Sequence, residues 1–136
     1  MIFKKLALAL AGITFSAGAF AAVSSDVSGF ISGSGLNARQ ERAVTQYAES
    51  LDQIANIDLG NQEAVISVNK EFMNAQQCLA QVYSIDQKPH MMRVSRQVYE
   101  KTFNTDELVT KYRQFLGQAL QEGAKALPSG KARACK

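Results

Sequence analysis

The chain has 136 residues, of which 46% are hydrophobic and 20% are charged, and its formal net charge is +3. This length is enough for one domain with one hydrophobic core. With one histidine, two cysteines and no G-x-S-x-G motif, the sequence offers little for catalysis. We therefore predict a protein that is not an enzyme and that carries no cofactor; the alternative is an enzyme whose turnover depends on His90.

The first 21 residues have the three parts of a secretory signal peptide. Lys4 and Lys5 supply positive charge, residues 6–15 form an apolar stretch, and A-x-A cleavage sites follow at 17–19 and 19–21. The alternative is an uncleaved anchor, but the apolar stretch is shorter than the roughly 20 residues that span a bilayer. We expect cleavage, no stable membrane insertion, and a periplasmic or secreted location.

Removal of this segment also changes the charge of the protein. Without Lys4 and Lys5, 13 lysines and arginines remain against 12 acids. Because nucleic-acid binding needs a concentrated basic face, this near balance excludes a nucleic-acid partner.

Residues 22–36 form the next segment, in which the stretch from Ser28 to Gly35 contains six serines and glycines. Such a composition is typical of flexible chain, so we predict a flexible leader over residues 22–36. The apolar residues within it leave open that part of the segment lies in a groove of the domain; they are Val23, Val27, Phe30 and Ile31.

A first helix is predicted to begin at Asn37, where Gln40 completes a capping box. Gly60 is predicted to end this helix, and Asn61 to cap the next one. The second helix repeats apolar residues at the 3-4 spacing of a bundle seam, namely Val65, Val68, Phe72, Ala75, Leu79 and Val82. Both segments therefore have the pattern of helices that bury one face.

A third helix is predicted from Pro89, which suits a first helical turn. A fourth follows the N-cap candidate Asn104 and ends before Pro128. Its apolar residues include Leu108, Tyr112, Phe115, Leu116, Ala119 and Leu120. Because short turns join the four helices, we predict an all-α domain over residues 37–136, folded as an up-and-down antiparallel four-helix bundle.

The two cysteines are Cys78, in the second predicted helix, and Cys135, one residue before the last. Exported proteins meet an oxidising environment in which cysteines are normally paired. We therefore predict a Cys78–Cys135 disulfide that tethers the C-terminal tail, with Cys78 flanking the core. Two free thiols or a disulfide-linked dimer are the alternatives.

His90, Met91 and Met92 follow one another near the start of the third helix. An imidazole beside two thioethers is a ligand set that suits copper(I). However, consecutive helical residues diverge by about 100°, and methionines also fill space in cores. These three residues are weak metal candidates, and no metal site is predicted.

The C-terminal tail is basic, with Lys131, Arg133 and Lys136 and no acid among its last residues. Such a tail is a candidate contact for an anionic partner or a membrane surface. The alternative is that its charge complements the end of the fourth helix.

The predicted organisation is thus a signal peptide at 1–21, a leader at 22–36 and a helical domain at 37–136. We predict a small exported protein that acts by binding an unidentified protein partner, as an inhibitor, an immunity protein or a chaperone-like module. The alternative is a periplasmic carrier of copper or a small ligand, with its site around residues 85–92.

Overall fold

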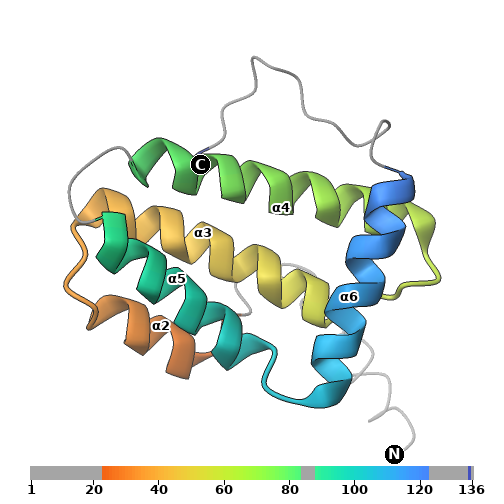
Figure 1. Cartoon of the computed structure of the whole chain (residues 1–136), viewed down its shortest axis with the longest axis horizontal. Helices are drawn as coiled ribbons and strands as arrows, with labels where there is room; N and C mark the ends of the chain where they lie inside the picture. The colour runs from red at the N-terminus through yellow and green to blue at the C-terminus, as the bar shows by residue number, and fades with distance from the viewer. Residues whose placement is uncertain (1–22, 84–87, 123–134, 136) are drawn as a thin grey trace, which may run out of the picture.

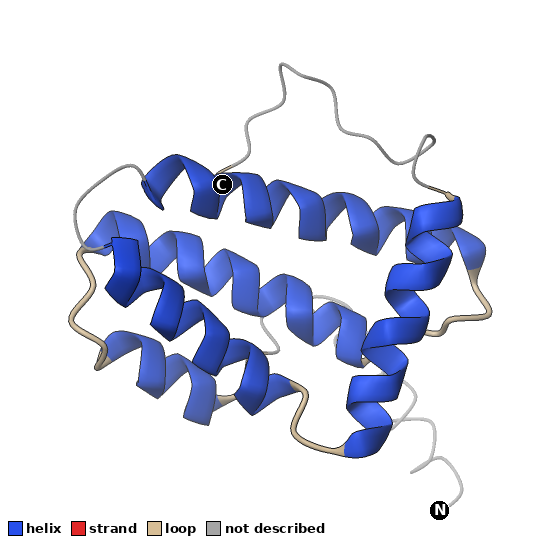
Figure 2. Ribbon diagram, in the orientation of Figure 1, coloured by secondary structure: helices blue, strands red, loops and turns tan. Residues whose placement is uncertain are grey.

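The computed structural model describes residues 23–83, 88–122 and 135, and these residues form five helices (Figure 1). They are α2 (Ser25–Ser32), α3 (Ala38–Ala55), α4 (Gln62–Tyr83), α5 (Lys88–Thr102) and α6 (Asp106–Gln121). No strand occurs in this described part (Figure 2), which confirms the all-α prediction. The predicted signal peptide at 1–21 lies outside the described residues.

Helix α3 lies at the centre of the molecule and packs against each of the other four described helices. In Figure 1, α2, α3, α4 and α5 run along the long axis and reverse direction from one to the next. Helix α6 instead crosses the end of the molecule where α3 ends and α4 begins. The predicted four-helix bundle is therefore not confirmed, because the fourth predicted helix does not lie antiparallel beside the third.

The start of α3 follows the predicted capping box. The Asn37 side chain accepts from the Gln40 backbone N–H at 2.8 Å, and the Asn37 N–H donates to Gln40 Oε1 at 3.2 Å. The helix ends at Ala55 with Asn56 as its C-cap, so the prediction of a cap at Gly60 was wrong. Asn61 does cap α4 as predicted, because its side chain accepts from the Ala64 N–H at 3.1 Å.

Helix α2 lies within the segment that was predicted to be a flexible leader, and the structure corrects that prediction over residues 25–32. Ser24 caps the helix by accepting from the Val27 N–H at 3.2 Å. Val27 and Ile31 are only 5% and 1% exposed, and α2 packs against α3 and α5. Burial of this i, i+4 pair offsets the low helix propensity of the surrounding serines and glycines.

An aromatic cluster holds α6 across the other helices. The Tyr112 ring on α6 lies 5.1 Å from that of Tyr99 and 4.9 Å from that of Phe103, and Phe115 lies 6.4 Å from Phe72 on α4. The N-cap of α6 is Thr105, whose hydroxyl accepts from the Leu108 N–H at 3.1 Å, and not Asn104 as predicted. The aromatic contacts thus determine the direction of α6, which the spacing of its apolar residues did not predict.

Candidate functional site

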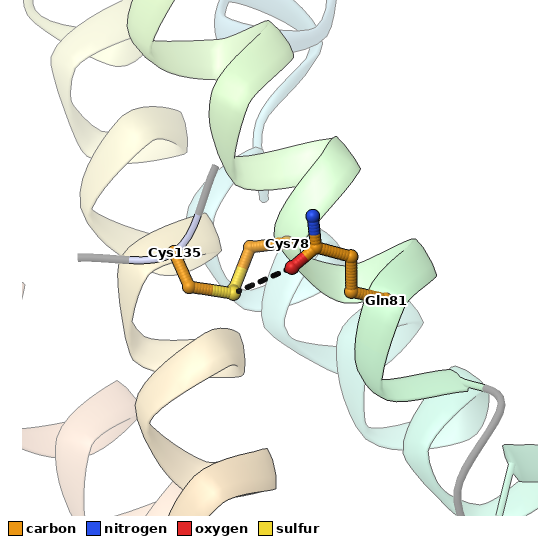
Figure 3. The surroundings of a disulfide bond; sticks show 3 residues. All are labelled: Cys78, Gln81 and Cys135. Atoms are coloured by element: carbon orange, nitrogen blue, oxygen red, sulfur yellow. Dashed lines mark hydrogen bonds between the residues drawn. A yellow bond between two sulfur atoms is a disulfide. The ribbon is translucent and has the colours of Figure 1, made fainter. Parts of the chain in front are cut away.

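The Cys78–Cys135 disulfide is present as predicted, with a Cα–Cα distance of 4.8 Å (Figure 3). Cys78 is 2% exposed and belongs to the buried core, so the expectation that it merely flanks the core was wrong. Gln81 Oε1 lies 3.6 Å from Cys135 Sγ, which as an oxidised sulfur has no proton to donate. The bridge fastens the C-terminal end of the chain to α4.

A shallow cavity of about 410 Å³ lies between α3 and α4 beside this disulfide. Its walls carry charges of both signs, from Arg39 and Arg42 and from Glu41 and Glu49. The predicted partner-binding residues Lys131, Arg133 and Lys136 lie outside the described residues.

The structure does not bring together the three metal candidates. Met91 is fully buried in the core, whereas the next residue, Met92, is 49% exposed. The His90 Nε2 atom lies 2.5 Å from the carbonyl oxygen of Ser34 and joins α5 to the turn after α2. In the described stretches, no group of three or more His, Cys, Asp or Glu side chains is arranged to hold a metal ion. The remaining positions of the 85–92 region, 85–87, lie outside the described residues.

An apolar groove of about 470 Å³ lies between α4 and α6. Phe72 and Ala119, which are 4% and 5% exposed, form its buried part. Leu116 and Leu120 on α6 also line it, and their exposed fractions are 37% and 79%. The other described lining residues are Asn69, Met73, Gln76 and Tyr112.

Helix α6 crosses α4 near the end of α6, where Gln62 Nε2 at the start of α4 donates to Glu122 Oε2 at 2.6 Å. Leu116 and Leu120 nevertheless stay exposed beside this crossing. The buried Asn69 donates its amide to Met73 Sδ at 3.4 Å. Met73 is a flexible side chain that can adapt to the shape of an occupant.

Tyr112 connects the groove to the aromatic cluster behind it. Burial raises the pKa of its hydroxyl above the ordinary 10.0, and the neighbouring Tyr99 raises it further. A tyrosine is uncharged at physiological pH even at its ordinary pKa, so the ring contributes an uncharged surface to the groove.

The sequence prediction missed this groove because it treated Leu116 and Leu120 as part of a buried face. Tyr112, Phe115 and Ala119 already complete one face of the helix. The two leucines widen the stripe beyond what one neighbouring helix covers. That excess width was the signal that could have indicated a surface site.

No family model matches the chain, and no curated protein or solved structure is significantly similar to it. Within the described ranges, no helix combines the length and the apolar character needed to cross a bilayer.

Proposed function

We propose that this is a small exported helical protein that acts by protein–protein binding, with the groove between α4 and α6 as its contact surface. The observation that carries the proposal is the exposure of Leu120 (79%) and Leu116 (37%) beside a pre-formed apolar groove. Clustered apolar side chains on a surface are typical of binding sites. Their burial by a partner would supply the driving force for association.

The partner segment that fits this groove is an amphipathic helix. Two helices form the walls, and on α4 the lining residues follow the i, i+3, i+4, i+7 pattern of a helical ridge: Asn69, Phe72, Met73 and Gln76. None of the described lining residues is charged. An apolar helix face would therefore lie between these ridges without burying an unpaired charge.

The exported setting is part of the proposal and has two supports. The first 21 residues have the pattern of a secretory signal peptide. The Cys78–Cys135 bridge is the form of cysteine that persists in oxidising compartments. A periplasmic or secreted inhibitor, immunity protein or chaperone-like module is consistent with both.

Site-specific cross-linking identifies what occupies the groove. A photoreactive amino acid replaces Leu120 in the protein as it is exported by living cells, and the same residue replaces Met92 as a control. Met92 is also an exposed apolar residue, but it lies on α5 away from the groove. We expect a covalent adduct with another protein from position 120 and not from position 92.

Two results would contradict the proposal. One is an adduct from position 120 that joins only residues 123–134 of the same chain, because these residues follow α6 directly. The other is the absence of any adduct while the full-length chain is exported and folded.

The native mass of the exported protein distinguishes the carrier alternative from the proposed binding of a protein. A bound ion or small molecule in the purified sample would favour that alternative and would contradict binding of a protein as the main role. A second protein that co-purifies with the disulfide-bonded chain would favour the proposal.

A further inference from the structure

The two sulfurs of the Cys78–Cys135 bridge differ in their exposure. Cys78 is 2% exposed and belongs to the core, whereas Cys135 is half-buried and packs on the outside of that core. In Figure 3 the side chain of Cys135 reaches Cys78 from outside the helix that carries Cys78. One end of the bridge therefore lies inside the molecule, and the other end lies at its surface.

The cavity of about 410 Å³ between α3 and α4 lies directly beside this bridge. Both cysteines line it, together with Ala43 and Thr45 on α3 and Gln81 on α4. None of the described residues that line the α4–α6 groove lines this cavity, so the two places are separate. A reagent in the cavity would lie next to the exposed end of the bridge.

Access to the two sulfurs decides how the bridge can react. A disulfide opens when a thiolate attacks one of its sulfurs and the other sulfur leaves. To attack Cys78 Sγ, a thiolate would have to enter the core, where its charge would lose its hydration. To attack Cys135 Sγ, it can remain in the cavity. Access therefore favours attack at Cys135.

The nature of the leaving group acts in the opposite direction. A buried thiolate is a poorer leaving group than a hydrated one, and this effect alone would favour attack at Cys78. However, a sulfur in a residue that is 2% exposed is reached only after the surrounding helices open. Cys78 also lines the cavity, so its departing sulfur can take a proton from water there. In the folded protein the difference in access is therefore the larger effect.

We propose that Cys135 Sγ is an exchange site for low-molecular-weight thiols, which reach it through the cavity between α3 and α4. The reagent's thiolate forms a mixed disulfide with Cys135, the bond between the two cysteines breaks, and the Cys78 thiolate takes a proton. A second thiol then attacks the reagent's sulfur in the mixed disulfide and releases Cys135, which is protonated in turn. Two thiols are thus oxidised to one disulfide, and their two electrons reduce the bridge.

The same steps in reverse close the bridge, with the oxidised reagent as the oxidant. The tether between the C-terminal end of the chain and α4 therefore opens and closes without prior unfolding of the helices. This exchange goes beyond binding in the groove and does not depend on it.

Mapping of the mixed disulfide in the full-length protein tests the site of attack. The folded protein is treated with reduced glutathione, samples are quenched with acid at early times, and the modified peptide is identified by mass spectrometry. We expect glutathione on Cys135. Glutathione mainly on Cys78, or equally on both cysteines, would overturn the inference.

The urea dependence of the reduction rate tests whether the folded protein reacts. Direct attack needs no unfolding, so we expect a rate that is proportional to the glutathione concentration and nearly constant in urea below the unfolding transition. A bridge that reacts only after the chain opens would be reduced at a rate that rises with urea, in parallel with the unfolded fraction. That result would overturn the inference.

Two tryptophan substitutions test the cavity as the route. Thr45 is half-buried and lines the cavity, so Thr45→Trp narrows it. Thr110 is exposed on α6 and does not line this cavity, so Thr110→Trp is the matched control. With both variants checked for an unchanged Tm, we expect the reduction rate to fall several-fold in Thr45→Trp and to keep its wild-type value in Thr110→Trp. Equal rates in all three proteins would contradict the cavity as the route.

Discussion

Tyr112 is the residue at which the core and the groove meet. Its ring packs against Tyr99 and Phe103 on one side and lines the α4–α6 groove on the other. The hydroxyl is half-buried, so its ionised form is disfavoured and its pKa lies above 10.0. Ionisation of this one group would therefore affect both the stability of the fold and the surface offered to a partner.

Alkaline titration of the tyrosines tests this account. Because the pKa of Tyr112 is raised in the folded protein, its contribution to stability is complete below pH 10 and is lost as the pH rises through the raised value. We expect one step of the tyrosine absorbance change to occur at a higher pH than the rest, and we expect the Tyr112→Phe variant to lack this step. Persistence of the late step in Tyr112→Phe would assign it to another tyrosine and contradict the account.

Among the helices, the sequence predicted an end correctly where the signal for it lies within a few neighbouring residues. The Asn37–Gln40 pair predicted the start of α3 correctly, because a capping box is contained within four residues. The N-cap of α6 is Thr105, one residue after the predicted Asn104, because both residue types are suitable N-caps. Segment 25–32 was predicted to be flexible because its serines and glycines outweighed its apolar pair.

A substitution in α2 tests whether this segment is a stable part of the domain. Gly29 is exposed within the helix, and a Cβ built there meets no atom within 4 Å. We expect Gly29→Ala to raise the free energy of unfolding by about 0.5–1 kcal/mol, because alanine loses less conformational freedom in a helix. Urea denaturation measures this change.

Gly35 provides the matched control for that substitution. It has a φ of 82° in the turn that follows α2, so an added side chain is strained there although space is free. We expect Gly35→Ala to destabilise the protein. If Gly29→Ala and the wild type had the same midpoint of urea denaturation, that result would support a flexible leader instead.

The direction of α6 could not be predicted from the sequence, and the groove depends on that direction. Helical periodicity identifies which residues are apolar but not which neighbour covers them. Contacts of Tyr112 and Phe115 with the ring of Phe72 on α4 help to determine the crossing, and these pairs are distant in the sequence. For this reason the core residues of α6 were predicted, whereas the exposure of Leu116 and Leu120 was not.

For the molecule as a whole, the disulfide was the long-range feature that the sequence did predict. With two cysteines only one intramolecular pairing exists, so no geometry was needed to identify it. The bridge closes a loop with a sequence separation of 57 between its ends. In the chain-entropy model a loop of this length contributes about 4 kcal/mol, which is an upper value.

Denaturation with and without reductant measures that contribution. We expect reduction to lower the free energy of unfolding by about 2–4 kcal/mol, because the unfolded chain regains the freedom of the closed loop. A Cys78→Ala, Cys135→Ala double variant should behave like the reduced protein and should no longer respond to reductant. A reduced protein as stable as the oxidised one would show that the bridge does not constrain the unfolded chain.

Binding of a partner protein in the α4–α6 groove is tested by the affinity of the cross-linked partner for variants of the groove. Calorimetric titration would compare the wild type, Leu120→Gln and Met92→Gln, all checked for an unchanged Tm. Burying a leucine is worth about 1.5–3 kcal/mol, so we expect Leu120→Gln to weaken the Kd roughly ten- to hundredfold. Met92→Gln should bind like the wild type. Equal Kd values for Leu120→Gln and the wild type would contradict the assignment of the groove as the binding surface.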